Sequence, residues 1–338
     1  MGRITTINRN IMKLKNMFYA PIIIALAALA GCDNDDSGKK PFDFSQFGPL
    51  VQNIAECTPG ITAVDSVKEH TLPGDLKMTE IAFKARFWNQ HIYIVEVDLD
   101  RDVTIVSSTP DDNPPTGGHQ TLDLHAAAAE NHGKTVYIGV NGDVCGSYSN
   151  SEGEYDGWKG GLVSAGPFVK DGVIYRSKFA PSTTSAFYIK NDGSAHLEKE
   201  EQYRADEQDV RDAIGGWHLL VWDGEIQEIP KADKTHYDPR TCLGISEDGK
   251  KVYFFIMDGR QPPYSYGMYL EDMAGIAKGT GCYRACNLDG GGSTTLVVRD
   301  ETAEGVSFKV FNRTCATEST AVDGARPLPN GLLVIASR

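Results

Sequence analysis

The sequence predicts an α+β or mixed α/β fold, with a largely antiparallel-to-mixed sheet packed with a few helices. Four of the Asp-Gly pairs, at 171–172, 192–193, 223–224 and 248–249, each lie between runs rich in β-forming residues. Such a pair predicts a hairpin, because a type I′ turn needs positive φ at both central positions. The middle of the chain is therefore expected to be mostly antiparallel strand.

Two helices are expected where a helical pattern ends at a glycine. Residues 121–132 (TLDLHAAAAENH) precede Gly133, and residues 268–278 (MYLEDMAGIAK) precede Gly279. Alanine and one-sided apolar spacing favour a helix, and glycine favours the left-handed conformation that closes it. An apolar, strand-like run follows each helix. This order predicts two layers, with helices packed on a mixed sheet.

The first 31 residues differ from the rest of the chain. A basic stretch is followed by the apolar residues 18–30, and the segment ends Leu-Ala-Gly-Cys at Cys32. This pattern predicts a secretory signal whose apolar run is too short to span a membrane. The last four residues resemble a bacterial lipobox, so Cys32 is expected to carry acyl chains that hold the protein on a membrane. An ordinary signal peptide with a chance cysteine is the alternative.

The remaining organisation follows from composition. Residues 32–49 are expected to be a flexible tether, because they are mostly polar and lack periodicity. Residues 50–338 are expected to form one domain. The acidic run after Cys32 resembles signals for the outer surface, so the expected location is a bacterial outer membrane lipoprotein, periplasm-facing or surface-exposed.

Net charge limits the classes of binding partner, and the cysteine count bears on disulfide formation. The net charge is −13, and it becomes −17 without residues 1–31, which hold four basic and no acidic residues. An acidic body argues against nucleic acid as the partner. Six cysteines follow Cys32, and an even number in an exported protein permits disulfides whose pairing stays open.

Polar residues cluster at four predicted strand ends or turns: 141–143 (NGD), 239–241 (PRT), 258–260 (DGR) and 287–295 (NLDGGGSTT). Rigid scaffolds present functional loops at such places. Arg240 and Arg260 flank one predicted hairpin, so both guanidinium groups are expected at one end of the sheet, where they suit phosphate or carboxylate. The amides of the glycine run suit an anion or a sugar hydroxyl.

Carboxylates supply the second half of this chemistry. Asp258 and Asp289 are candidates for a carboxylate pair, or for ligands of a divalent cation such as calcium. The sequence itself requires no cofactor, and its histidines show no metal-ligand spacing. Plainer interpretations remain open: Asp258-Gly259 and Asn141-Gly142 as ordinary turns, the glycine run as a tight connection, and Arg240 as a surface ion-pair partner.

In order, the four clusters resemble the phosphodiester glycosidase family over roughly residues 90–338. The matching segments are VNGD (140–143), PRTCLGISEDG (239–249), FFIMDGRQPPYSYGMYLEDMA (254–274) and CNLDGGGSTTLVV (286–298). A closing ARPLPNGLLVI (325–335) places Arg326 where the family often carries arginine. The residues after Asn141-Gly142 depart from the family's usual Gly-Phe-Phe, and residues 150–158 have no counterpart.

The resemblance implies hydrolysis of the C1–O bond of an N-acetylglucosamine-like sugar 1-phosphodiester, with a phosphomonoester as the leaving group. Asp289 would be the nucleophile or would stabilise an oxocarbenium-like transition state, with Asp258 or Asp143 as the other carboxylate. The expected substrate-binding residues are Asn141, Arg240, Arg260, Asn287, Gly290, Gly291, Gly292, Ser293, Thr294 and Arg326. The expected partner is a phosphorylated sugar or glycan.

Two other functions fit the same residues. One is a non-catalytic surface glycan-binding lipoprotein whose aromatic platform would draw on Trp158, Trp217, Trp222, Tyr264 and Tyr266. The other is a phosphodiesterase that cuts the P–O bond in a cell-wall or capsular polysaccharide.

Overall fold

Antiparallel strands dominate the structure, and they form two main sheets that pack face to face. The computed structural model describes residues 41–115, 118–144, 148–149, 155–156, 164–230, 236–303, 305–316 and 324–337. Contacts divide the chain after Pro41, and Phe42–Arg338 forms one compact unit. Every strand pairing in these ranges is antiparallel. The predicted α+β class, mostly strand with a few helices, is confirmed.

The first sheet has 12 strands and runs in the order β1-β2-β3-β15-β14-β16-β12-β10-β11, with β8, β9 and β13 attached beside β12. Its strands are β1 (Ile61–Leu72), β2 (Leu76–Ala85), β3 (Trp88–Asp98), β8 (Phe168–Lys170), β9 (Val173–Arg176), β10 (Thr183–Lys190), β11 (Ala195–Glu198), β12 (Val210–Trp222), β13 (Glu225–Ile226), β14 (Arg240–Ile245), β15 (Lys251–Met257) and β16 (Arg284–Asn287).

The second sheet has five strands in the order β18-β17-β5-β19-β4. These are β4 (Val103–Ser108), β5 (Val136–Asn141), β17 (Leu296–Thr302), β18 (Gly305–Val310) and β19 (Gly331–Ala336). A separate pair joins β6 (Tyr148–Ser149) to β7 (Tyr155–Asp156).

All four predicted Asp-Gly hairpins are present. The turns at 171–172 and 223–224 have positive φ at both residues, as a type I′ turn requires. At 192–193 and 248–249 only the glycine has positive φ, so these two connections use other turn geometry.

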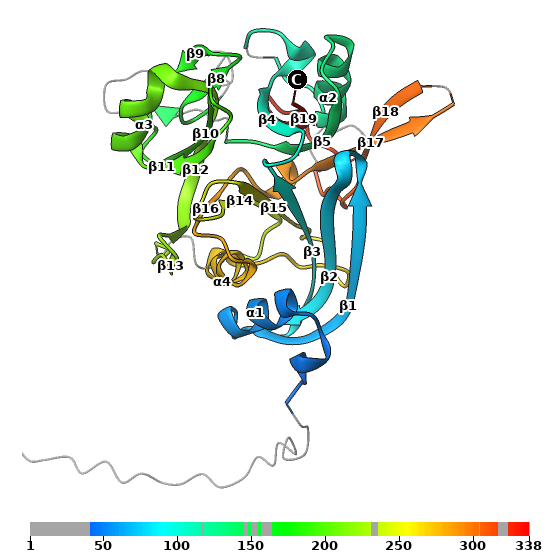
Figure 1. Cartoon of the computed structure of the whole chain (residues 1–338). Coiled ribbons are helices and arrows are strands. Elements are labelled where there is room, and N and C mark those ends of the chain that lie inside the picture. The colour runs from blue at the N-terminus through cyan, green and yellow to red at the C-terminus, as the bar shows by residue number, and fades with distance from the viewer. Residues whose placement is uncertain are drawn as a thin grey trace, which may run out of the picture. The chain divides into compact units, whose positions relative to one another are not determined.

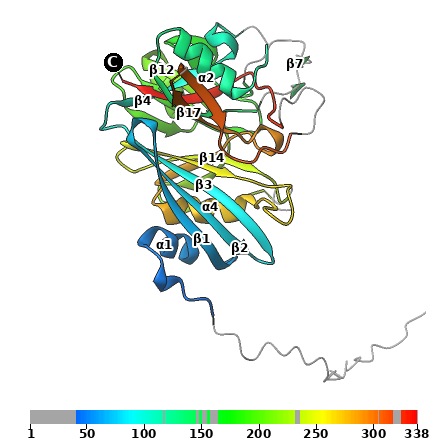
Figure 2. The ribbon, with the colours of Figure 1, turned by 90° about the vertical axis from the view of Figure 1, so that its right-hand side faces the viewer.

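Helices cover the outer faces of both sheets, which gives four layers (Figures 1 and 2). Four α-helices lie within the described residues: α1 (Pro49–Cys57), α2 (Leu122–Asn131), α3 (Glu200–Asp206) and α4 (Leu270–Thr280). Helices α1 and α4 pack on the first sheet, and α2 packs on the second. The two-layer prediction therefore missed one sheet and one helical layer.

Side-chain alternation explains the layers. Phe254 faces the core between the sheets, whereas its neighbour Phe255 faces α1 and α4. On β19, Val334 faces the same central core, whereas Leu333 packs under α2. Strands buried on both faces read as continuous apolar runs, because successive side chains point to opposite sides.

Two sequence expectations need correction near α1 and α4. Helix α4 continues through Gly279 and ends at Thr280, and the next residue, Gly281, closes it with a φ of 98°. Gly279 serves packing instead, because a Cβ there would lie 2.5 Å from Ile54 Cα in α1. The C-terminal part of the predicted tether is also ordered, since Phe42, Phe44 and Phe47 pack against this core.

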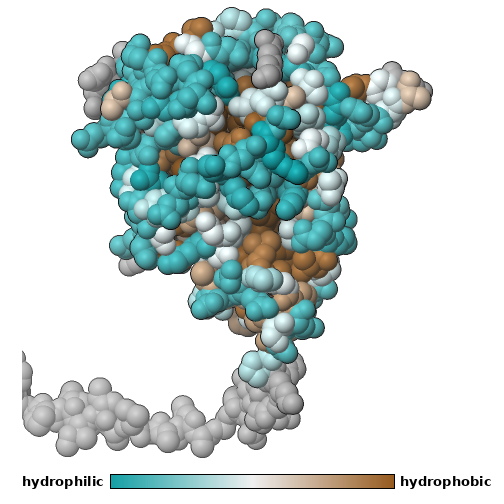
Figure 3. All heavy atoms as spheres, in the orientation of Figure 1, coloured by the Kyte–Doolittle hydropathy of each residue, from teal (hydrophilic) through white to brown (hydrophobic). Residues whose placement is uncertain are grey.

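The surface between α1, α4 and strands β2 and β3 is hollowed and shows apolar residues (Figure 3). The hollow has a volume of about 320 Å³, and Leu50 and Ile94 contribute to its lining. Among the described residues, no helix is both long and apolar enough to span a lipid bilayer. The predicted signal segment, Cys32, Cys145 and Trp158 lie outside the described residues.

Candidate active site

The four polar clusters predicted from the sequence meet at one end of the two sheets. The Gly291 N–H donates to Pro239 O and the Asp289 N–H donates to Gly142 O, each at 2.9 Å. A Cβ on Gly259 would lie 2.7 Å from Pro239 N, so these two backbones touch. Strand ends of both sheets thus present all four clusters to one place.

Asn141, the last residue of β5, ties these strand ends together. Its Nδ2 donates to Asp289 O at 2.7 Å. Its Oδ1 accepts from the Thr241 hydroxyl at 2.6 Å and from the Thr295 N–H at 3.1 Å. The side chain is fully buried. It is therefore placed to position the glycine loop, and the expected contact with a sugar hydroxyl does not fit this burial.

Asn287, Ser293 and Thr294 are also buried. The Asn287 Nδ2 donates to Leu288 O at 2.6 Å, so this amide too is used within the protein. The Ser293 hydroxyl accepts from Arg326 Nη1 at 3.0 Å. Of these three side chains, only Ser293 links directly to a charged group of the site.

The glycine run lies directly against two guanidinium groups. A Cβ on Gly291 would lie 3.2 Å from Nη1 and Nη2 of Arg260, and a Cβ on Gly292 would lie 2.7 Å from Nη2 of Arg326. Gly291 also has a φ of 61°, a conformation that favours glycine. The run therefore permits two arginines to approach the backbone from two sides.

The amides of this run are less available than expected. The Gly290 N–H donates to Asp289 Oδ1 at 2.9 Å, and the Gly291 N–H donates to Pro239 O. Both are engaged within the protein. The arginine side chains, more than the amides, supply positive charge at this loop.

Arg240 and Arg260 lie near each other, as expected, but differ in environment. Arg240 is largely buried and donates to Met268 O at 3.2 Å and His236 O at 3.0 Å. Arg260 is half exposed and pairs with Asp238. Arg240 is thus held by backbone carbonyls, whereas Arg260 faces the glycine run and solvent.

Asp289 follows β16 and is partly exposed. Burial raises its pKa above the usual range, while hydrogen bonds from Ser293 and Gly290 and the charge of Arg326 oppose that rise. The carboxylate is therefore surrounded by donors on one side and remains accessible from the other.

Asp143 is the second carboxyl group close to this loop. Its side chain is buried, and Oδ2 accepts from the Ser164 hydroxyl at 2.6 Å and the Gly166 N–H at 2.7 Å. Burial raises the pKa of Asp143 to about 7, and the negative charge of Asp289 adds to the rise. Its Oδ1 has no hydrogen-bond partner among the described residues. Asp143 can therefore hold a proton near neutral pH.

Asp258 occupies a different environment. Its buried carboxylate accepts from Asn312 Nδ2 at 2.9 Å, from the Arg313 N–H at 3.1 Å and from the Tyr264 hydroxyl at 2.9 Å. Burial raises its pKa to about 6 against these three hydrogen bonds. Asn312 also donates to Thr294 O at 3.1 Å. Asp258 thus fixes the segment after β18 against the end of the glycine loop.

Three rings of the predicted aromatic platform, Trp222, Tyr264 and Tyr266, are each engaged in a local contact. Lys199 and Arg284 lie over the Trp222 ring at 4.3 and 4.1 Å. Tyr264 is bound to Asp258, and Tyr266 stacks on Trp88 with ring centroids 4.3 Å apart. These three rings therefore belong to separate local contacts.

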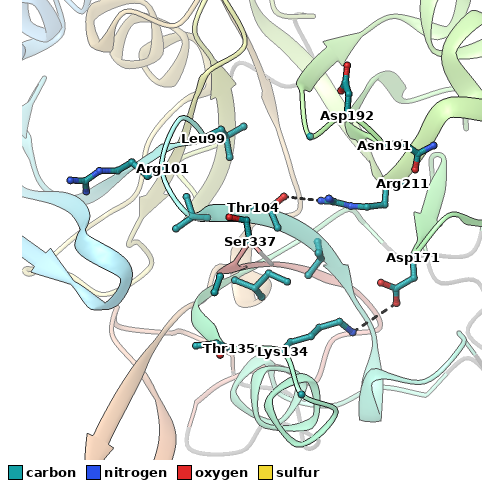
Figure 4. A pocket seen from close by; sticks show the side chains of 16 residues that line it. Leu99, Arg101, Thr104, Lys134, Thr135, Asp171, Asn191, Asp192, Arg211 and Ser337 are labelled. Carbon is teal, nitrogen blue, oxygen red and sulfur yellow. Dashed lines mark hydrogen bonds and ion pairs between the residues drawn. The ribbon is translucent and has the colours of Figure 1, made fainter.

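A cavity of about 760 Å³ lies at the opposite ends of β5 and β19 from the glycine loop. Figure 4 shows Lys134 pointing toward Asp171, and Arg211 toward Thr104. Lys134 Nζ also lies 2.5 Å from Asp112 Oδ2. None of the predicted site residues lines this cavity.

Within the described ranges, no group of three or more His, Cys, Asp or Glu side chains is placed to hold a metal ion. Five cysteines, namely Cys57, Cys242, Cys282, Cys286 and Cys315, are free.

Comparison with known proteins assigns the class to which this fold and site correspond. A sequence model of the phosphodiester glycosidase family matches residues 134–335. This range is more than half of the chain, so the protein belongs to the phosphodiester glycosidase family. The match begins further along the chain than the resemblance near residue 90 suggested.

Individual relatives are more distant. The SPbeta prophage-derived uncharacterized protein YomE of Bacillus subtilis (strain 168) is 31% identical over 159 residues, covering 45% of this chain and 24% of that protein. The matched region therefore spans about a quarter of the length of this curated relative.

Two solved structures share the fold. The catalytic domain of zebrafish N-acetylglucosamine-1-phosphodiester alpha-N-acetylglucosaminidase, auto-inhibited by its pro-peptide, gives a TM-score of 0.51 at 20% identity, covering 81% of this chain and 82% of that one. A hypothetical protein from Synechocystis gives 0.50 at 12% identity, covering 80% and 64%. At these identities the likeness concerns the fold alone.

Sequence reasoning missed several residues of the site. Ser164 and Asp238 stand in no motif, although each contacts a predicted residue. One signal was available for the surroundings of Asp143. A Cβ on Gly215, inside β12, would lie 2.5 Å from Asp143 Oδ2, and a glycine within a strand often marks such close approach.

Proposed function

We propose that this protein hydrolyses the glycosidic C1–O bond of an N-acetylglucosamine-like sugar 1-phosphodiester, releasing the sugar and a phosphomonoester. Family membership supports the class of reaction. The observation that carries the proposal is the contact of Arg260 and Arg326 with the glycine run beside Asp289. Together these groups provide an anion site next to a carboxylate.

Arg260 and Arg326 bind the phosphate of the substrate. A phosphomonoester is a good leaving group, so stabilising its charge contributes more than protonating it strongly. Positive groups already fixed where charge develops lower the barrier without reorganisation. Arg240, whose side chain is held by backbone carbonyls, adds a third positive charge to the phosphate site.

Asp289 acts on the sugar. In its ionised form it is the nucleophile or stabilises the oxocarbenium-like transition state at C1. Asp143 holds a proton at neutral pH and donates it within the site, since its pKa of about 7 lies close to the working range. This pairing keeps one carboxyl charged and one neutral.

We assign Asp258 a positioning role in place of a catalytic one. Three donors already satisfy its buried carboxylate. Asn141 and Asn287 likewise position the loop, whereas Ser293 links Asp289 to Arg326. Contacts to sugar hydroxyls would then come from groups other than these two buried amides.

We further propose that the protein is an exported lipoprotein anchored through Cys32 and that it acts on a wall or capsular phosphosugar. The sequence of residues 1–32 supports export and lipidation. Cys32→Ser should shift the protein from the membrane fraction to the soluble fraction of cells that make it. Unchanged membrane association of that variant would contradict anchoring through this residue.

Product analysis tests the reaction. The protein is incubated with an α-N-acetylglucosamine 1-phosphodiester, and the products are identified by mass spectrometry. Free sugar plus a phosphomonoester is the expected outcome. Sugar 1-phosphate would identify a phosphodiesterase that cuts the P–O bond. Binding without any product would identify a glycan-binding protein.

A further inference from the structure

Asp238 brings a negative charge directly into the arginine-lined part of the candidate site. Its Oδ1 lies 2.9 Å from Arg260 Nε and 2.8 Å from Arg260 Nη2. Its Oδ2 lies 3.8 Å from Arg240 Nη2. One carboxylate therefore faces two guanidinium groups of the site.

The backbone of Asp238 is fixed by contacts with the loop after β15. The Met268 N–H donates to Asp238 O at 3.0 Å. Gly267 has a φ of 95°, and a Cβ on it would lie 2.4 Å from the carbonyl carbon and oxygen of Asp238. Only glycine permits this contact, so the loop after β15 fixes the carboxylate beside Arg260.

The ion pair leaves part of Arg260 available. Asp238 takes the side of the guanidinium formed by Nε and Nη2, while Nη1 and Nη2 lie over Gly291. The side chain of Arg260 is 50% exposed and that of Asp238 is 24% exposed. An anion bound at the glycine run would thus meet Arg260 and Asp238 together.

We propose that Asp238 makes this site selective for a phosphodiester over a phosphomonoester. The inference rests on the proposed function, because it places a phosphodiester at Arg260. A diester carries one negative charge, whereas a monoester approaches two above its second pKa of about 6. The fixed carboxylate repels the second ligand more strongly, so substrate is favoured over product.

Coulomb's law gives the size of this discrimination. Two unit charges about 6 Å apart in water have an interaction energy that changes a binding constant about threefold. A doubly charged ligand experiences twice that interaction, or about tenfold. Removing the charge of Asp238 should therefore strengthen monoester binding about three times more than diester binding.

The test measures binding of two small anions that contain no glycosidic bond. Dimethyl phosphate and methyl phosphate are titrated at pH 8 by calorimetry into the wild-type protein and Asp238→Asn. Asparagine keeps an oxygen to accept from Arg260 and removes the charge. Asp223→Asn is the matched control, because Asp223 pairs with Arg284 at 2.8 Å and lines no part of this site.

Asp238→Asn should bind methyl phosphate about tenfold and dimethyl phosphate about threefold more tightly than the wild type, with Asp223→Asn unchanged. An equal change for both anions would mean that Asp238 only positions Arg260, and it would overturn the proposal. So would failure of the wild type to bind either anion. Thermal unfolding checks that the variants are folded.

These outcomes separate the two proposals. A wild-type protein that shows the predicted selectivity but releases no sugar from a phosphodiester would refute the proposed reaction and leave the selectivity intact. Sugar release with identical anion selectivity in wild type and Asp238→Asn would do the reverse.

Discussion

The two ends of the five-stranded sheet differ in how their charged side chains are arranged. At one end, the cavity near Lys134 and Arg211 is large, but both of these cations are paired with carboxylates. Lys134 and Lys170 both bond to Asp112, and Arg211 bonds to Asp212. At the other end, Arg260 and Arg326 lie on the glycine run, beside two carboxyl groups whose pKa values are raised.

The difference shows that cavity size is a poor guide to chemistry in this protein. At the cavity, carboxylates pair with both Lys134 and Arg211. At the glycine loop, Asp238 pairs with Arg260 through Nε and Nη2, and Nη1 of Arg260 still lies against Gly291. Carboxyl groups with raised pKa values beside cations provide both a proton and an anion site. The glycine-loop end therefore is the better candidate for catalysis, and five variants test this contrast.

The largest effect is expected for Asp289→Asn. Removing the carboxylate that acts on C1 should reduce kcat for sugar release by about 10³-fold or more. The asparagine side chain preserves the size of the residue, so thermal unfolding should change little. The matched control at the other end is Asp192→Asn, which should retain activity within about twofold. Full activity of Asp289→Asn would reject the assigned site.

Gly292→Ala should weaken substrate binding next. The added Cβ would lie 2.7 Å from Arg326 Nη2, so this guanidinium must move away from the loop. KM for a phosphodiester should rise about tenfold, which corresponds to the loss of one charged contact. Gly118→Ala is the control, because its new Cβ meets nothing closer than 3.8 Å. A normal KM in Gly292→Ala would remove Arg326 from the phosphate site.

Asp143 predicts a particular pH dependence. Its pKa is about 7 when folded and about 3.9 when unfolded. Between these values the folded state holds the extra proton, so the free energy of unfolding falls as pH rises through this window. In the wild type, this group should lower the free energy of unfolding by about 2 kcal/mol between pH 5 and 7. Asp143→Asn should lack that decrease, as measured by denaturant titration at each pH.

The same group should control activity. Because the protonated form of Asp143 is assigned the active role, kcat/KM of the wild type should decline as pH rises through about 7. A profile that increases through this range would mean that Asp143 acts as a base.

Asp258→Asn should mainly affect stability. The new amide faces three donors with one acceptor oxygen, and unpaired buried donors cost about 1–3 kcal/mol. The folded fraction should retain kcat within about tenfold, since the carboxylate touches no proposed reacting atom. A loss as large as that of Asp289→Asn would return Asp258 to the catalytic pair.

The smallest effect is expected for Lys134→Met at the large cavity. Asp112 keeps its contact with Lys170, so activity should stay within about twofold. A tenfold loss of sugar release would show that the two ends of the sheet are functionally coupled and would break the comparison.

Local patterns predicted much of the fold. The hairpins at 171–172 and 223–224 follow from turn chemistry, which depends on two neighbouring residues. Helix α1 escaped prediction because it has only nine residues, of which two, Val51 and Ile54, are buried. The end of α4 was misplaced because Gly279 serves contact with Ile54, a feature that only tertiary packing reveals.

The candidate site divides along the same line. Convergence of Asn141, Thr241 and the glycine run could be predicted, since all lie at strand ends. The different contacts of Arg240 and Arg326 could not be predicted, because Arg240 contacts Met268 and Arg326 contacts Ser293, which lie in distant segments of the chain. The raised pKa of Asp143 likewise depends on burial beneath β12, which no local pattern encodes.

Hydrolysis in ¹⁸O-labelled water tests the central claim most directly. Cleavage of the C1–O bond transfers the water oxygen to the sugar and leaves the bridging oxygen on the phosphomonoester. The label should therefore appear at C1 of the released sugar, as measured by mass spectrometry. Label in the phosphate product would mean P–O cleavage and would contradict the assignment of this protein as an active phosphodiester glycosidase.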